Sequence, residues 1–240
     1  VTTAIEHESV LQSVDELEKQ GFEVIRLMPD KQGRITEQQV FDAVNSDTIL
    51  VSMMYVNNEV GSIMPVKSIK KAVKRANAPA LIHIDCVQAF GKLEVKPSKL
   101  GADLVTVTAH KIHGPKGVGA LYLKKGTRIL PRVFGGEQEK KLRPGTEAIP
   151  LIAGFGVAAD LIPDLKKQSE KIKEINTYAK EGLLSVPGVK INSGDDASDY
   201  IINLFVPTFM TSQTVVQHLS SKYGVYVSNG SACAKGKRSH

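Results

Sequence analysis

Short apolar runs alternate with amphipathic segments over the first half of the chain. Residues 1–10 have the pattern of a strand that runs directly into a helix, and this helix ends at Gly21, a residue type favoured just after a helix. Thr36 and Gln39 have the spacing of a capping box, which predicts the start of a second helix. Further segments are predicted as a helix over 66–76 and as strands over 22–27, 48–55, 81–85, 103–109 and 119–126.

The predicted strands are continuous apolar runs without a polar face. Strands of this kind, alternating with helices, indicate an α/β fold with a mostly parallel sheet that is covered on both sides. Ligands bind beyond the carboxyl ends of such strands. Polar side chains occur at these ends in three places, namely Asn57 and Asn58, Asp85 and Gln88, and His110 and Lys111. If the three strands are neighbours, these residues form one site.

The pattern changes from about Pro150. Residues 151–186 are predicted as one long helical region, bent near Pro163. Beyond it, strands are predicted over 189–194, 199–207 and 225–230, and a helix over 212–224. We therefore expect a large domain over 1–160 and a smaller α+β domain over 161–240.

The composition excludes several classes of protein. The chain has 31 basic and 25 acidic residues, but the basic residues are scattered and there is no Trp, so direct nucleic-acid binding is not indicated. No apolar run is long enough to span a bilayer, which argues against a membrane protein. Its two cysteines have no metal-finger spacing and favour a reduced, cytoplasmic setting. Both ends of the chain suggest a piece of a longer protein.

Lys111 is the most distinctive candidate residue. A lysine at a buried strand end must be paired, neutralised or covalently engaged, and a lysine of lowered pKa forms Schiff bases with aldehydes. Alternatively, the aliphatic part of the Lys111 side chain extends from the strand end and places the ammonium group in solvent. Asp85 favours the first interpretation, because pyridoxal phosphate enzymes need a lysine and an acid beneath the pyridine nitrogen. Alone, Asp85 would be interpreted as the cap of the following turn.

Two other kinds of site are compatible with the same residues. His83, Asp85, His110 and His113 could supply the ligands of a metal site, although no helical ligand spacing such as HExxH is present. The stretch "HGPKGVG" has the composition of a hairpin connection and lacks the Walker pattern, although Thr108 and His110 could hold a phosphate.

The cysteines differ in their surroundings. Cys233 lies in the polar, basic stretch "SNGSACAKGKRSH", where nearby cations favour its thiolate and a mobile loop could carry its sulfur to a site. An inert, buried role is the commoner one for a cysteine. Cys86, within "DCVQAF", is predicted to be such a packed small residue.

Six motifs in order carry a resemblance to a known family. They are "EHESVL", "VNNEVG", "HIDCVQAFGK", "TAHKIHGPKGVGALY", "LRPGTE" and "SNGSACA", and together they run nearly from end to end. The chain resembles the cysteine desulfurases, which are class V members of the fold-type I pyridoxal phosphate enzymes. The form of the last motif is similar to that of the housekeeping and nitrogen-fixation group.

The resemblance implies a role for each matching residue. Lys111 would bond pyridoxal 5′-phosphate and later move the α-proton of the substrate, with Asp85 at the pyridine nitrogen and His7 stacked on the ring. The other implied cofactor contacts are Gln88 and Asn58 at the phenolic oxygen, Thr108 and His110 at the phosphate, and Thr146 at the phosphate of a partner subunit. Cys233 would take sulfur from L-cysteine as a persulfide, releasing alanine.

The resemblance also implies partners and shows departures. It implies a homodimer that passes sulfur to an acceptor protein, either an iron–sulfur scaffold or a thiolation enzyme. Lys140 and Lys141 stand where relatives commonly have an Arg-Gly pair, and His113 stands where they have an aromatic residue. Segments that bind phosphate and the substrate carboxylate in relatives have no match here, so we expect the chain alone to be weak or inactive. The competing functions are a selenocysteine lyase, an aminotransferase, and a noncatalytic truncated chain.

Overall fold

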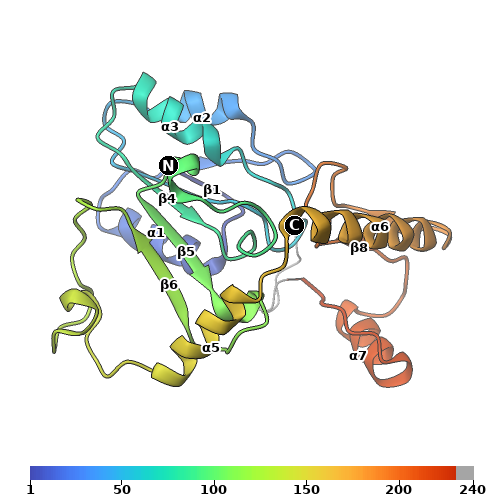
Figure 1. Ribbon diagram of the computed structural model, residues 1–240. Coiled ribbons are helices and arrows are strands. Elements are labelled where there is room, and N and C mark those ends of the chain that lie inside the picture. Colours follow the sequence, from blue (N-terminus) through green and yellow to red (C-terminus); the bar gives the residue numbers. More distant parts are fainter. Residues whose placement is uncertain (231–240) are drawn as a thin grey trace.

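The computed structural model describes residues 1–230 (Figure 1). The larger α-helices are α1 (Glu8–Lys19), α2 (Glu37–Ala43), α3 (Val66–Arg75), α5 (Ile149–Asp160), α6 (Leu165–Leu184) and α7 (Ser212–Tyr223). Shorter helical turns are α4 (Pro97–Leu100), η1 (Ala109–Lys111) and η2 (Gln138–Lys141). The strands are β1 (Thr2–Thr3), β2 (Arg26–Leu27), β3 (Leu50–Met54), β4 (Leu81–Asp85), β5 (Leu104–Thr108), β6 (Gly119–Leu123), β7 (Lys190–Ile191) and β8 (Leu204–Phe205).

A mainly parallel sheet forms the centre of the molecule. Its strands follow the order β3-β4-β5-β6, in which the first three are parallel and β6 is antiparallel to β5. Val1 extends the ladder, because its carbonyl accepts a hydrogen bond from the Ser52 N–H at 3.0 Å. β1 in turn pairs in parallel with β2. The predicted α/β class and parallel sheet are therefore confirmed.

The core lies between this sheet and α3. Alternate side chains of the strands, such as Val51, Met53 and Ile84, are almost wholly buried, as is Ile69 on α3. Burying an aliphatic side chain of this size stabilises the fold by ~1.5–3 kcal/mol. α2 and α3 lie together on one side of the sheet, with α1 on the other (Figure 1). The opposite face of the strands carries Ser52 and Met54, both buried, beside His83 and Asp85, which are described below.

Local signals in the sequence explain where two helices begin and end. Thr36 and Gln39 form the predicted capping box, in which each side chain bonds the backbone of the other residue. This satisfies two donors that the first turn of α2 would otherwise leave unpaired. Gly21 adopts a φ of +93° just beyond α1, as predicted for a residue that ends a helix.

Three local predictions differ from the structure. The helical region 151–186 is two helices, because α5 ends at Asp160 and Asp164 caps the new helix α6. Pro163 thus separates the helices instead of bending one, consistent with its missing N–H. The strand predicted over 225–230 is wrong, because this exposed segment has no strand beside it among the described residues. The strands over 22–27, 189–194 and 199–207 shorten to β2, β7 and β8.

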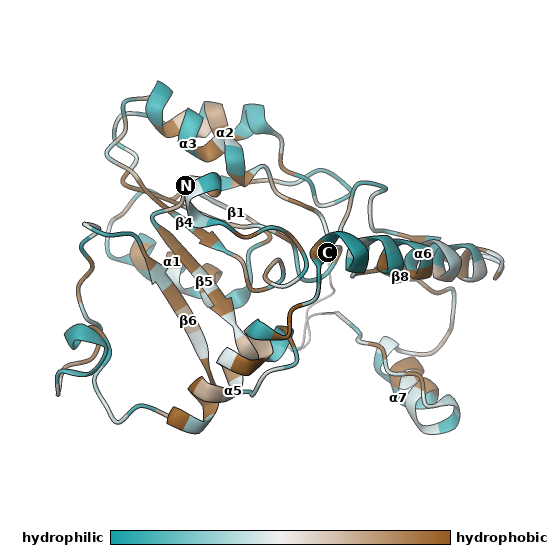
Figure 2. Ribbon diagram, viewed as in Figure 1, coloured by the Kyte–Doolittle hydropathy of each residue, from teal (hydrophilic) through white to brown (hydrophobic). Residues whose placement is uncertain are grey.

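The C-terminal region extends to one side of the sheet. α6 and α7 point away from it, and the surface of α6 is mostly hydrophilic (Figures 1 and 2). The region is joined to the loop after β3 through a hydrogen bond from the Ser198 N–H to the Gly61 carbonyl at 2.8 Å. Asn203 also donates to the Glu59 carbonyl at 3.3 Å. Within residues 1–230, no helix combines the length and apolarity needed to cross a membrane.

Candidate functional site

The carboxyl ends of three neighbouring parallel strands meet at one edge of the sheet. β4 lies between β3 and β5, and Asp85 stands in register with Met54 on one side and Thr106 on the other. The polar residues that follow these strands therefore come together, as the sequence predicts. This edge of the sheet is the candidate site.

Asp85 ends β4 as a buried carboxylate. Its side chain is 9% exposed, and its Oδ1 accepts the Val87 N–H at 2.8 Å. The predicted turn cap is thus present, and it holds the carboxylate in one orientation. Oδ2 has no hydrogen-bond partner among residues 1–230, so it can accept a proton or a hydrogen bond from a ligand.

His83 lies two residues before Asp85, on the same face of β4. Its Nδ1 lies 2.8 Å from the Ser52 hydroxyl and its Nε2 lies 2.8 Å from the Thr106 hydroxyl. Burial lowers the pKa of this imidazole, which favours the neutral ring. Because both nitrogens are occupied, His83 cannot also ligate a metal. Residues 1–230 hold no group of three His, Cys, Asp or Glu side chains that could bind one.

Lys111 projects from the short turn η1, directly after β5. Its side chain is exposed, and it has no carboxylate partner in the described part of the chain. α5 packs against this turn, since a Cβ on Gly154 would lie 2.6 Å from Pro115 and one on Gly114 would lie 3.1 Å from Ala158. The close packing of α5 against residues 114–115 therefore holds the turn that carries Lys111 in place.

Thr108 and His110 form a pair beside Lys111. The Thr108 hydroxyl lies 2.9 Å from His110 Nδ1 and 3.3 Å from the Val118 carbonyl. It carries one proton, so it either donates to His110, which leaves Nε2–H free for an anion, or donates to Val118 and accepts from Nδ1–H. Burial and the charges of Lys111 and Lys116 lower the pKa of His110. The same two cations make this end of the sheet favourable for a phosphate.

His113 has a backbone explanation. It adopts a φ of +65°, in the left-handed region, where the connection between β5 and β6 turns back. Histidine is one of the side chains that tolerate this region better than most. The stretch "HGPKGVG" is therefore the hairpin connection of the antiparallel pair β5 and β6, and His113 helps the chain to turn.

The loop after β3 gives its two asparagines different tasks. Asn57 is buried, and its amide donates to the Ile5 carbonyl at 3.0 Å while its oxygen accepts the N–H groups of Glu59 and Val60. Asn58 is half-buried and has no side-chain partner among the described residues. Asn57 thus holds the loop, whereas the amide of Asn58 is available to a ligand.

Gln88 lies in the turn after β4, one helical turn before Lys92. The Lys92 ammonium donates to Gln88 Oε1 at 3.2 Å and lies 5.7 Å from the centre of the Tyr200 ring. Burial and then the charge of Lys111 lower the pKa of Lys92. Lys92 was not singled out from the sequence, although its i, i+4 spacing from Gln88 was a usable signal.

Glu6 and His7 border the site from the segment before α1. His7 Nδ1 accepts the Ser9 N–H at 3.2 Å and so caps α1, which leaves Nε2 available. Glu6 is buried, accepts hydrogen bonds from Thr3 and Met54, and was not singled out from the sequence. Burial, opposed by these bonds and supported by the charge of Asp85, raises its pKa to about 7.

The two remaining predicted site residues are Thr146 and Cys233. Thr146 lies in the exposed connection between η2 and α5. Cys233 lies outside the described residues. The other cysteine, Cys86, is a buried free thiol whose pKa burial raises to about 12, as expected of a packed, inert side chain.

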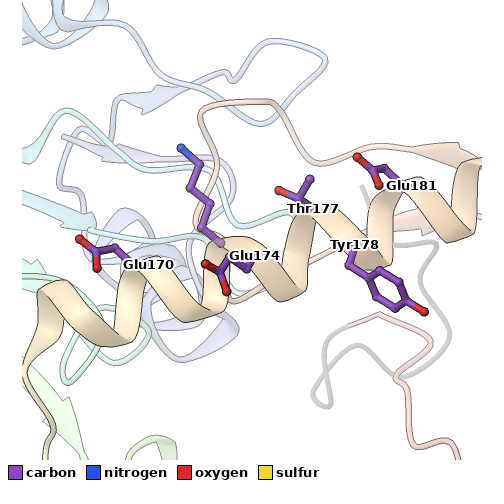
Figure 3. Close-up of a pocket in the computed structure, with 6 residues that line it drawn as sticks. Glu170, Glu174, Thr177, Tyr178 and Glu181 are labelled. Atoms are coloured by element: carbon purple, nitrogen blue, oxygen red, sulfur yellow. The ribbon is translucent and has the colours of Figure 1, made fainter.

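A groove on α6 is separate from the site. Its volume is about 550 Å³, and all its lining side chains belong to that one helix (Figure 3). They are Glu170, Lys173, Glu174, Thr177, Tyr178 and Glu181. The groove contains no cysteine, serine or histidine side chain, and none of the strand-end residues lines it.

Comparison with known proteins decides the family. A family model described as aminotransferase class-V matches residues 1–239. The chain belongs to the aminotransferase class-V family. Among relatives of this class-V chain, "Cysteine desulfurase IscS" from Methanosarcina thermophila is 38% identical over 235 residues, covering 97% of the chain and 57% of the relative.

Solved structures agree with this assignment. A structure named "NIFS-LIKE PROTEIN" is 36% identical with a TM-score of 0.88, covering 95% of this class-V chain and 62% of that one. Another, named "SspA in complex with cysteine", is 34% identical with a TM-score of 0.78, covering 96% and 63%. The resemblance to cysteine desulfurases and the fold-type I architecture are thereby confirmed. The chain spans less than two thirds of these relatives.

The strand-end residues fit pyridoxal 5′-phosphate, the cofactor that the resemblance implies. Lys111 is an exposed amine that has no ion-pair partner within residues 1–230, as bonding to an aldehyde requires. In the same described part of the chain, one carboxylate oxygen of Asp85 has no partner and can meet a pyridinium N–H. Thr108 and His110 lie beside the cations Lys111 and Lys116, which suits a phosphate. The three chemically distinct parts of the cofactor thus each have a matching group at one edge of the sheet.

Proposed function

We propose that the whole protein, of which this chain is part or all, is a pyridoxal phosphate-dependent cysteine desulfurase. The observation that carries this proposal is the convergence of Asp85 and the Lys111 turn at the ends of adjacent parallel strands, β4 and β5. Similarity to relatives named as cysteine desulfurases supports it. A chain that bound partners without catalysis would not need an unpaired lysine and a buried carboxylate at this place.

Each residue of the site has a proposed role that follows from its position. Pyridoxal phosphate, when bound, supplies an aldehyde for the substrate amine and a protonated ring that withdraws electrons from the α-carbon. Lys111 would hold the aldehyde carbon and would later move the α-proton of the substrate. Asp85 would keep a proton on the pyridine nitrogen. Gln88 and Asn58 would hold the phenolic oxygen, Thr108 and His110 the phosphate, and His7 would cover the ring.

Cys233 is the proposed sulfur acceptor within the chain. Its thiolate attacks the sulfur of L-cysteine, so that the substrate Cβ–S bond breaks and a new S–S bond forms on Cys233. The electron pair of the broken bond stays with the substrate carbon, which takes up a proton, and L-alanine leaves. No external oxidant is needed, because the substrate carbon is reduced as the protein sulfur is oxidised.

The proposal is tested by following both products. Purified protein mixed with pyridoxal phosphate and L-cysteine should release alanine, and Cys233 should gain the mass of one sulfur atom. Cys233→Ser should abolish the mass gain, and Lys111→Ala should abolish alanine release. An aminotransferase would keep its activity in Cys233→Ser, and a noncatalytic chain would yield neither product. Either outcome, obtained with the full-length protein, would overturn the proposal.

We further propose a homodimer. Apolar side chains are exposed along β6 and α5, among them Leu121 at 48% and Ile149 at 62%. An apolar surface of this kind marks an interaction site more often than a free face. Thr146 lies next to it, which suits its predicted contact with the phosphate of a partner subunit. Sedimentation should show a dimer that Ile152→Glu weakens, whereas Tyr178→Glu on exposed α6 should not.

The destination of the sulfur completes the proposal. An acceptor protein, either an iron–sulfur scaffold or a thiolation enzyme, takes it from Cys233. A cytoplasmic location is proposed because this transfer needs reduced thiols.

A further inference from the structure

Lys92 is a half-buried cation that the proposed chemistry leaves without a task. It follows β4 in the turn over residues 87–92, four residues after Gln88. Hydrogen bonds from the Lys92 and Leu93 N–H groups to the Ala89 carbonyl, at 3.0 and 2.8 Å, give this turn a helical course. Residues four apart therefore lie on one face, which brings the Lys92 ammonium to 3.2 Å from Gln88 Oε1.

The turn is held against the segment that carries Lys111. Gly91 has a φ of +76°, and a Cβ at this position would lie 2.7 Å from Ile112, the residue directly after Lys111. On its other side, the Lys92 ammonium faces the Tyr200 ring at 5.7 Å. Tyr200 comes from the C-terminal region, so three separate segments enclose Lys92.

No carboxylate neutralises this cation. Among residues 1–230, no Asp or Glu lies within ion-pair distance of Lys92, whereas the nearby Lys96 and Lys99 both pair with Glu94. A cation that is withdrawn from water and beside another lysine is unfavourable. Its hydrogen bond to Gln88 is thus the specific polar contact made at this position.

The chemistry of the two side chains restricts how Gln88 is oriented. A glutamine amide has an acceptor end and a donor end that are nearly identical in shape. A lysine ammonium has donors only, so the oxygen of Gln88 must face Lys92. The NH2 group must then face the other way. Gln88 without this lysine could present either end to a ligand.

We propose that Lys92 is a positioning residue, which fixes the polarity of Gln88 so that its NH2 group, and not its oxygen, meets the anionic phenolic oxygen of the cofactor. This inference rests on the proposed function. It assigns Lys92 no contact with substrate and no proton transfer.

The full-length protein loaded with pyridoxal phosphate should absorb visible light, and this absorption band changes with pH. The pH at the midpoint of the change is a readout separate from activity. A hydrogen bond donated by the Gln88 NH2 group stabilises the anionic form of the phenolic oxygen. Without that hydrogen bond, the oxygen binds a proton more tightly and the pKa of the bound cofactor rises. Lys92→Met should therefore raise the pH midpoint of the band by about one pH unit. Lys92→Arg keeps a donor and should restore the midpoint. Lys96→Met removes a charge at a nearby exposed position and should leave it unchanged.

If Lys92 acts by orienting Gln88, its effect on the pH midpoint must depend on the presence of Gln88. In a Gln88→Leu background, Lys92→Met should cause little further shift, because no amide remains to be oriented. A full shift in that background would show that Lys92 acts directly by its charge, and an unshifted Lys92→Met would show no positioning at all. Both results overturn the inference.

Two further outcomes are distinguishable. If wild-type protein forms no visible band with pyridoxal phosphate, the proposed function itself fails. If thermal unfolding shows that Lys92→Met does not fold, Lys92→Gln replaces it, since an uncharged amide can present either end to Gln88. An unshifted midpoint in Lys92→Gln would then overturn the inference.

Discussion

The strand-end site and the C-terminal helices are built in opposite ways. The site lies over a core in which Val51, Met53 and Ile84 are essentially inaccessible. Its carboxylate Asp85 is buried and hydrogen-bonded. Helices α5 and α7 bury no residue, and α6 buries only Asn176. The dense packing beneath the strand-end site holds each side chain in one rotamer. The C-terminal helices instead offer exposed surface for contacts with other molecules.

This difference separates positioning from association. Groups that must keep one orientation, such as Asp85 and the Lys111 turn, follow a densely packed sheet. The apolar side chains of α5 stay exposed, where a second chain can cover them. Substitutions should therefore act on folding in one region and on contacts in the other.

The largest expected difference comes from one substitution made in both regions. Ile69→Ala removes a side chain of α3 that is 0% exposed, and should lower the free energy of unfolding by about 2–5 kcal/mol. Ile152→Ala on α5, where the side chain is 43% exposed, should cost about 1 kcal/mol or less. Urea unfolding followed by circular dichroism measures both. Equal losses would contradict the contrast.

Glu6 provides a test through pH. Its pKa is raised from 4.5 to about 7, so between these pH values the unfolded chain loses a proton that the folded chain keeps. Stability should therefore fall as the pH rises through this window, by roughly 3 kcal/mol in total. Glu6→Gln should remove that part of the pH dependence. Parallel stability–pH curves for wild type and variant would contradict the prediction.

The contact between the two regions is tested at Gly61. Its φ is +77°, and an added Cβ would lie 3.1 Å from Cβ of Ile201 in the C-terminal region. Gly61→Ala should cost about 2 kcal/mol through backbone strain and this close approach. Gly21 also has a positive φ but has nothing within 4 Å, so Gly21→Ala should cost about 1 kcal/mol from strain alone. Equal costs would mean that the regions are not in contact here.

The smallest expected effect is at Lys141. This residue and the preceding Glu139 and Lys140 all have a positive φ, which non-glycine side chains rarely adopt. Lys141→Gly should relieve that strain and stabilise the fold by about 1 kcal/mol. Lys141→Ala keeps the Cβ and should bring no such gain. Thermal unfolding of the two variants distinguishes strain from loss of the charge.

Local signals predicted much of the fold because they act through neighbouring residues. The capping box of Thr36 and Gln39 and the glycine that ends α1 depend on a single turn of helix. The strand predicted over 225–230 depended instead on a partner strand, and its alternation of residues could not show that residues 1–230 provide none. Pro163 indicated a disturbance, but only the cap at Asp164 made it the start of a separate helix.

For the site, too, the sequence predicted what depends on neighbouring residues and not what depends on distant partners. Asp85, Gln88 and Lys111 follow strand ends, and parallel pairing brings such ends together. The tasks of Asn57, His83 and Lys92 depend on partners from other segments, which no spacing reveals. Lys141 shows the reverse case, because its departure from the usual glycine was visible in the sequence and its positive φ explains why glycine is common there.

The central claim is that the edge formed by β3, β4 and β5 binds pyridoxal phosphate through Lys111. The direct measurement is to mix the full-length protein with pyridoxal phosphate, reduce with borohydride, digest, and locate the label by mass spectrometry. We predict that the label lies on Lys111 and that Asp85→Ala weakens its formation. A label spread over exposed lysines such as Lys96, or concentrated on another residue, would contradict the account.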